Sequence, residues 1–260
     1  MRYGVLTALA LSAVALFGAT AAQAEQGDRL KEEAMKPKVI FFDVNETLLN
    51  LEGVRSSVAE ALGGREDLLP LWFSTMLHHS LVETATGRFH PFGEVGVAAL
   101  MMVAETNGVE LTEEDAKTAI LEPLKSLPPH PDVRPGLEAL KEQGYTLVSL
   151  TNSSNAGVKA QLENAGLADL FDRMLTVEDT KIYKPNLAVY EWALDRMGVE
   201  PEEAMMVAAH GWDIAGIKAA GMQGVFVARP GKALYPLAIP PDFVVADLGE
   251  LAEAMKQRAQ

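Results

Sequence analysis

Residues 38–49 read Lys-Val-Ile-Phe-Phe-Asp-Val-Asn-Glu-Thr-Leu-Leu. The apolar run that opens this segment has the length and the β-branched and aromatic content of a buried parallel strand. The run ends at Asp43, and a short polar loop follows. Ligands of open α/β sheets bind in the crevice at the carboxyl ends of the strands. Asp43 is therefore a candidate for chemistry, whereas an isolated Asp at such a place would simply form a turn.

From residue 133 onward, strand-like and helix-like segments alternate. The expected strands are 146–150, 173–177, 204–208, 224–227 and a short last one at 243–245. The expected helices are 136–143, 156–165, 187–197, 214–220 and 248–256. This alternation predicts an α/β fold with a doubly wound parallel sheet.

The segment between the first strand and this region is different. Apolar residues recur at helical spacing over 54–62, 68–82 and 92–107, and Thr112 is a plausible N-cap for one more helix. Pro123 and the Pro-rich segment 127–131 are expected to end this block. We interpret residues 53–129 as an all-helical cap domain, inserted into a core domain made of 37–52 and 130–260.

Polar side chains follow several of the expected strands, as an acidic residue follows the first. Because the carboxyl ends of parallel strands meet at one edge of a sheet, these side chains should converge on Asp43. Each signal is weak alone, since a surface Lys or a helix-capping residue is common, but the combination predicts an active site. The candidates are Thr151, Asn152, Lys184, His210 and Asp213.

Composition and charge narrow the classes of partner. The 260 residues carry a net charge of −14 and no Cys. Such an acidic chain has no electrostatic footprint for nucleic acid or an anionic membrane. Without Cys, the chain has no disulfides, thiolate catalysis or Cys-ligated metal. We expect a small-molecule partner, with a homodimer left open as the oligomeric state.

The first residues are typical of a secretory signal peptide. Arg2 provides a positive start, residues 5–17 an apolar core, and residues 22–24 (Ala-Gln-Ala) a cleavage site. The apolar run is too short for a comfortable membrane span; an uncleaved anchor is the alternative. We expect residues 1–24 to be removed, which takes away Arg2 and no acid and so changes the net charge from −14 to −15. The mature protein is then periplasmic, with no membrane contact.

With these motifs, nearly all of the mature chain resembles the haloacid dehalogenase superfamily. The more specific similarity is to the type II 2-haloacid dehalogenases, whose Lys-Pro pair with a Tyr six residues after the Lys is matched by Lys184, Pro185 and Tyr190. The resemblance implies a Rossmann-like core with a helical cap and Asp43 as a covalent nucleophile. It also implies a hydroxyl at Thr151.

Two departures separate this chain from the phosphatases of the superfamily. Those enzymes carry a general-acid Asp two positions after the nucleophile, where this chain has Asn45, which cannot donate a titrating proton. Their final motif has a Gly-Asp pair whose Asp holds Mg²⁺, and the matching residues are Ala208 and Ala209. Alanine offers no oxygen ligand to a hard cation. We therefore expect neither a metal nor a cofactor, and a small-molecule phosphatase is the second hypothesis.

The first hypothesis is a metal-independent hydrolase that removes halide from short 2-haloalkanoic acids. Asp43 would attack the carbon bearing the halogen, giving an ester that water then cleaves. Lys184 would keep Asp43 ionised. Asp213, with His210, would orient or deprotonate the water, while Thr151 and backbone amides hold the substrate carboxylate. The residues expected to complete the substrate and halide site are Asn45, Asn152, Tyr190, His210, Trp72 and Phe73.

A third hypothesis follows from a missing charge. Members of the resembled family carry an Arg directly after a Trp in the second cap helix, where this chain has Trp72 and Phe73. His78, His79 and Arg88 are the candidates to replace it. The third hypothesis is a catalytically vestigial periplasmic binding protein that kept the fold while losing this Arg.

The signal-peptide interpretation predicts a defined mature start. N-terminal sequencing of protein recovered from the periplasmic fraction should give Glu25 as the first residue, because residues 22–24 present small side chains to the peptidase. A periplasmic protein that still begins at Met1 would contradict cleavage.

Overall fold

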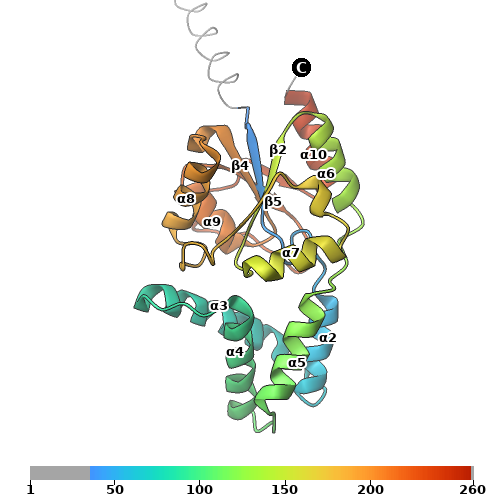
Figure 1. Ribbon diagram of the computed structural model, residues 1–260, viewed down its shortest axis with the longest axis vertical. Helices are drawn as coiled ribbons and strands as arrows, with labels where there is room; N and C mark the ends of the chain where they lie inside the picture. Colours follow the sequence, from blue (N-terminus) through green and yellow to red (C-terminus); the bar gives the residue numbers. More distant parts are fainter. Residues whose placement is uncertain (1–35, 259–260) are drawn as a thin grey trace, which may run out of the picture. The chain divides into compact units, whose positions relative to one another are not determined.

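The computed structural model describes residues 36–258. Its central element is the first strand, β1 (Val39–Phe42), which is completely buried and lies inside a six-stranded sheet of order β3-β2-β1-β4-β5-β6 (Figure 1). All neighbouring strands run parallel. The other strands are β2 (Thr146–Thr151), β3 (Arg173–Thr176), β4 (Ala204–Ala208), β5 (Gln223–Val227) and β6 (Phe243–Val245). The predicted parallel α/β sheet is confirmed.

Helices cover both faces of the sheet, as the doubly wound pattern requires. α8 (Leu187–Met197) and α9 (Gly211–Ala219) lie on one side, and α6 (Val133–Glu142) and α10 (Leu248–Arg258) on the other (Figure 1). The remaining elements of this part are α7 (Asn155–Asn164) and the short 3₁₀ helices η2 (Ala168–Leu170) and η3 (Pro201–Glu203).

Four α-helices separate β1 from α6, and we call residues 52–124 the cap. They are α2 (Glu52–Ala61), α3 (Leu69–Thr86), α4 (Phe92–Thr106) and α5 (Glu113–Leu124), with η1 (Glu66–Leu68) before α3. Within the cap, α2 packs on α5 and α3 on α4. Thr112 caps α5 as predicted, since its Oγ1 accepts the N–H of Asp115 at 3.1 Å. Every described element of the cap is helical.

Several boundaries differ from those predicted by a few residues, and two of these differences have a local physical reason. Pro123 does not end the helical block but lies in the last turn of α5, where a missing N–H removes a single helical bond. α9 begins at Gly211 rather than at residue 214, so Asp213 lies in its first turn. The polar start of α9 shows no apolar periodicity, but an acidic side chain is favoured there by the helix dipole. The predicted signal peptide lies outside the described residues.

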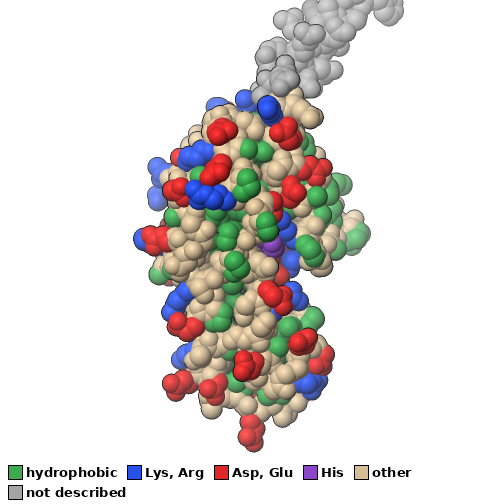
Figure 2. Space-filling model, turned by 90° about the vertical axis from the view of Figure 1, so that its right-hand side faces the viewer, with side chains coloured by type: hydrophobic (Ala, Val, Ile, Leu, Met, Phe, Trp, Pro, Cys, Tyr) green, Lys and Arg blue, Asp and Glu red, His purple; other side chains and the backbone are tan. Residues whose placement is uncertain are grey.

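Residues from Pro37 onward belong to one compact unit. Its hydrophobic core continues from the sheet into the cap, with Phe41 of β1 and Leu100 of α4 both inaccessible to solvent. On the face shown in Figure 2, basic and acidic side chains are interspersed rather than segregated. Within residues 36–258, no helix has the length and apolar character needed to span a membrane.

The packing of α6 on α10 can be tested at one position. A Cβ added at Gly136 would overlap the Cβ of Leu248 and lie 2.9 Å from its carbonyl carbon. We expect Gly136→Ala to destabilise the fold by about 1–3 kcal/mol through overpacking, measured as a lower midpoint in thermal unfolding. Gly53→Ala, with no atom within 4 Å of the added Cβ, is the matched control. Equal midpoints for the two variants would contradict this packing.

Candidate active site

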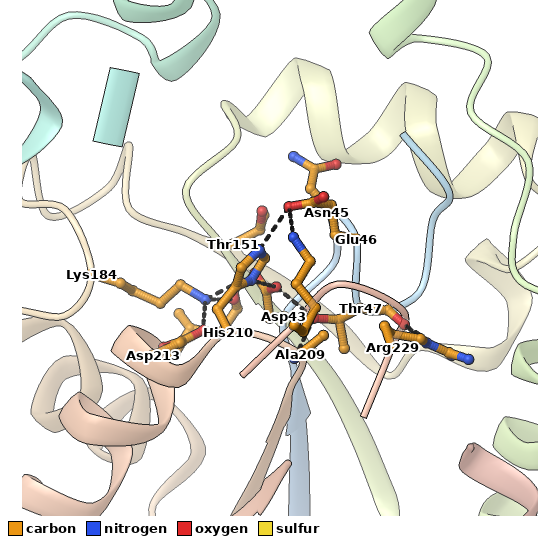
Figure 3. Close-up of polar contacts among 12 residues, drawn as sticks. Asp43, Asn45, Glu46, Thr47, Thr151, Lys184, Ala209, His210, Asp213 and Arg229 are labelled. Atoms are coloured by element: carbon orange, nitrogen blue, oxygen red, sulfur yellow. Dashed lines mark hydrogen bonds and ion pairs between the residues drawn. The ribbon is translucent and has the colours of Figure 1, made fainter. Parts of the chain in front are cut away.

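Asp43 directly follows the end of β1, and three side chains contact its carboxylate. Its N–H donates to the carbonyl of Val207 at 3.0 Å, which fixes the loop against β4. Oδ1 lies 3.1 Å from Nζ of Lys184, and Oδ2 accepts the Thr47 hydroxyl at 2.7 Å. Nδ1 of His210 is 3.3 Å from Oδ2, close enough for an ion pair but not aligned for a hydrogen bond (Figure 3).

Lys184 is buried, and its ammonium group is fully satisfied. Besides Asp43, Nζ donates to Oδ2 of Asp213 at 2.6 Å and to the carbonyl of Leu150 at 2.9 Å. These contacts use all three N–H donors of the ammonium group. Burial opposes the charge, but the two carboxylates outweigh it and raise the pKa of Lys184 above its ordinary value. Lys184 is therefore a permanent cation between two acids.

The two carboxylates on Lys184 differ in basicity. Burial works against ionisation of Asp43, but Lys184, His210 and Thr47 together hold its pKa well below the usual range. Burial, with the nearby charge of Asp43, raises the pKa of Asp213 despite Lys184. Tyr190 donates its hydroxyl to Oδ1 of Asp213 at 2.6 Å. Environments that separate the pKa values of paired acids often mark distinct catalytic roles.

A second layer of contacts positions Thr47. Its hydroxyl oxygen accepts the N–H of Ala209 at 3.0 Å, which joins the loops after β1 and β4. Arg229 donates to the Thr47 carbonyl through Nε and Nη2, at 3.1 and 3.0 Å, and pairs with Asp132 at 2.7 Å. The sequence analysis did not select Thr47, Arg229 or Asp132. The spacing of Thr47 four residues after Asp43 is the one local sign, whereas Arg229 and Asp132 are 97 residues apart.

His210 precedes α9 and is held between two acids and two rings. Nε2 contacts Oε2 of Glu46 at 2.9 Å, opposite the Asp43 contact. The rings of Phe73 and Trp212 stack on the imidazole at centroid distances of 6.2 and 5.2 Å. Burial opposes its charge, but Asp43 and Glu46 outweigh it and raise the pKa of His210 to about 9. An imidazole already protonated at neutral pH cannot take a proton from water, which leaves Asp213 as the candidate base.

A cavity of about 140 Å³ opens in front of Asp43. It is slightly smaller than an engineered cavity of about 150 Å³ that holds benzene. The predicted site residues that line it, besides Asp43, are Asn45, Trp72, Phe73, Thr151 and Asn152. The structure thus brings the cap pair and the strand-end residues to one space. His210, Lys184, Asp213 and Tyr190 contact Asp43 or one another without lining this cavity.

The polar lining of the cavity is itself held in place. Asn45 donates to Oγ of Ser153 and accepts from Gln161, both at 3.1 Å. Asn152 accepts the backbone N–H of Lys184 at 3.1 Å, and Thr151 accepts the N–H of Ser153 at 3.2 Å. These contacts leave the amide N–H₂ of Asn152 and the hydroxyl proton of Thr151 available to a ligand.

The three candidates for the missing cap Arg do not reach this cavity. Arg88 and His78 are exposed, and His79 lines a separate groove between cap helices. Trp72 donates its indole N–H to the carbonyl of Gly96 at 3.0 Å, a hydrogen bond that joins α3 to α4 within the cap. None of the three candidates therefore places a charge at this cavity. The cations near Asp43 belong to the core.

No group of three or more His, Asp or Glu side chains within residues 36–258 is arranged to hold a metal ion. Ala209 contributes only its backbone N–H, to Thr47. The space between the Asp43 and Asp213 carboxylates is filled by the ammonium group of Lys184.

Two characterised dehalogenases are similar to this chain over most of their length. The (S)-2-haloacid dehalogenase 1 of Pseudomonas sp. (strain CBS-3) is 32% identical over 224 residues, which cover 86% of this chain and 98% of that protein. The haloacetate dehalogenase H-2 of Moraxella sp. (strain B) is 29% identical, with 81% and 94% covered.

Solved structures show the same likeness. The L-2-haloacid dehalogenase from Xanthobacter autotrophicus with chloropropionic acid covalently bound superposes with a TM-score of 0.77 at 27% identity, over 85% of this chain and 98% of that one. A sequence profile of the haloacid dehalogenase-like hydrolases matches residues 37–221. The chain therefore belongs to the haloacid dehalogenase-like hydrolases, and it is an enzyme similar to the 2-haloacid dehalogenases.

Proposed function

We propose that the protein releases halide from short 2-haloalkanoic acids through a covalent ester on Asp43, without a metal ion. The observation that carries the proposal is the Asp43 carboxylate at the wall of a small cavity. Lys184 pairs with one of its oxygens and His210 with the other. Asp43 is 5% exposed, so little water competes for its charge. A desolvated, ionised carboxylate is suited to nucleophilic displacement at carbon.

In the first step, one carboxylate oxygen of Asp43 forms a bond to the carbon bearing the halogen. The carbon–halogen bond breaks, and its electron pair leaves with the halide. The negative charge thus moves from Asp43 to the leaving group. Lys184 and His210 lie within ion-pair distance of Asp43, at 3.1 and 3.3 Å. Both cations therefore contact the carboxylate whose charge is lost in this step.

In the second step, water adds to the carboxyl carbon of the Asp43 ester. Asp213 is the base, because burial raises its pKa and so makes it the more basic acid of the pair. The carboxyl carbon releases the product oxygen, which takes one of the water protons and becomes a hydroxyl group. The other proton leaves to solvent, and the carboxylate of Asp43 is restored.

The cavity is suited to a short acid with one apolar and one anionic end. Trp72, Phe73 and Met76 form an apolar wall from the cap. The opposite lining includes Ser153 and Ser154 at the amino end of α7. The N-terminus of a helix favours an anionic group. We infer that the substrate carboxylate faces α7 and that its alkyl group faces the cap.

The phosphatase hypothesis receives no comparable support. The Asn45 amide is hydrogen-bonded to Ser153 and Gln161, and an amide cannot transfer a proton to a leaving group as a general acid does. Phosphoryl transfer depends on cations that neutralise the phosphate oxygens. Here the two acids nearest the cavity are paired with Lys184 instead.

The proposed setting of the enzyme comes from sequence alone. Residues 1–24 have the composition of a signal peptide, and we propose that the mature enzyme works in the periplasm on a small-molecule haloacid. An enzyme exported without Cys depends on its core rather than on disulfides for stability.

The proposal predicts halide release that depends on Asp43 and tolerates chelator. The wild-type enzyme should release chloride from 2-chloropropionate equally well with and without EDTA, because Lys184 supplies the positive charge. Asp43→Asn should abolish release, since a neutral amide is a poor nucleophile. Chloride is measured by ion chromatography, with fluoroacetate as a second substrate.

The matched assay is phosphate release from an aryl phosphate in Mg²⁺. We expect none above the Asp43→Asn background. Mg²⁺-dependent phosphate release, or loss of dehalogenation on chelation, would contradict the proposal. An enzyme silent in both assays would point to the vestigial binding protein.

A further inference from the structure

Glu46 has a backbone conformation that its side chain does not favour. Its φ is 62°, and Lys181 is the one other non-Gly residue with positive φ in the described part of the chain. Such a conformation is uncommon outside Gly, Asn and Asp. Residues held in it tend to occur at functional sites, where the surrounding contacts maintain the strain. The contacts of the Glu46 side chain should therefore show what maintains this backbone conformation.

The carboxylate of Glu46 bridges two cations behind the nucleophile. Oε2 lies 2.9 Å from Nε2 of His210 and 2.6 Å from Nζ of Lys232, and the side chain is 11% exposed. Burial works against its charge, but His210 and Lys232 outweigh it and lower the pKa of Glu46 to about 2. Glu46 is thus an anion throughout the working pH range.

His210 directs its second ring nitrogen at the nucleophile. The Glu46 contact at Nε2 fixes the ring orientation, as a partner on one ring nitrogen does for His residues generally. The other nitrogen, Nδ1, is buried, points to Asp43 at 3.3 Å and has no hydrogen bond to any described residue. An unsatisfied buried donor beside a nucleophile is suited to an anion that forms there during the reaction.

The surroundings of His210 contain few other charges. Asp43 and Glu46 contact it directly, Lys184 lies beyond Asp43, and Lys232 beyond Glu46. His130 reaches the backbone carbonyl of Glu46 at 3.3 Å, and the acid Asp213 is paired with Lys184. The cap and α9 present the rings of Phe73 and Trp212.

We propose that Glu46 is a positioning residue that holds His210 as a fixed imidazolium, whose Nδ1–H stabilises the oxyanion that forms on Oδ2 of Asp43 when water adds to the ester. The inference rests on the proposed function. Before displacement the imidazolium faces the Asp43 carboxylate. Once Asp43 is an ester, its carbonyl oxygen gains negative charge as water adds to the carboxyl carbon, and the same N–H lies beside that oxygen.

The direct test follows His210 by NMR in protein with labelled histidine. The chain has five His, and the His210 signal is identified by its loss in His210→Asn. The wild-type His210 should titrate near the pKa of about 9 given by its two acids. In Glu46→Gln the midpoint should fall by about 1–2 pH units, because one adjacent opposite charge is lost.

Two variants control the sign and the specificity of this effect. Glu52→Gln removes an exposed acid near the same loop and should leave the His210 midpoint unchanged. Lys232→Met removes a cation beyond Glu46, so the midpoint should stay or rise. Glu46→Gly, whose backbone suits a φ of 62°, should fold at least as well as the wild type while losing the high midpoint.

Kinetics provide a readout that a merely structural role would not move. The kcat of Glu46→Gln for 2-chloropropionate should drop roughly tenfold at alkaline pH and recover as the pH is lowered. An active wild type whose His210 midpoint and pH profile do not change in Glu46→Gln would overturn this inference and leave the proposed function intact. An inactive wild type would refute the proposed function, while the NMR titration still decides whether Glu46 holds the charge on His210.

Discussion

The site depends on burying one cation. Lys184 is 1% exposed, and its three donors end on Asp43, Asp213 and the carbonyl of Leu150. Each acceptor comes from a different strand-end segment, so satisfying the ammonium group fixes all three at once. Removing one partner of a buried ion pair typically costs about 3–5 kcal/mol. The geometry around the nucleophile is therefore tied to the stability of the fold.

The sequence predicted the parts of the site that topology controls. Asp43, Lys184 and Asp213 each follow an apolar strand, and parallel strands bring such residues to one edge. Glu46 and His210 are 164 residues apart, and their pairing depends on a left-handed backbone that no motif indicates. The three cap candidates for the missing Arg do not line the cavity, and the cations near Asp43 lie on the core. Sequence spacing shows which residues are near an edge, not which way each side chain turns.

Core and cap divide the chemistry between them. The core supplies the charges, and the cap supplies Trp72, Phe73 and Met76 as an apolar wall. Phe73 also stacks on His210, so the cap contacts the charge network without adding to it. An apolar wall excludes water and strengthens the electrostatic interactions inside. The proposed preference for a short haloacid rests on the small cavity in front of Asp43.

The central claim, that Asp43 becomes covalently bound, is tested most directly by following oxygen atoms. A single turnover of 2-chloropropionate with excess enzyme in ¹⁸O-water, analysed by mass spectrometry, reports where the water oxygen goes. Attack of water on the ester carbonyl places ¹⁸O in the peptide that contains Asp43 and leaves the first lactate unlabelled. Label in the first lactate and none in Asp43 would show that water attacks the substrate directly and that Asp43 is only a base.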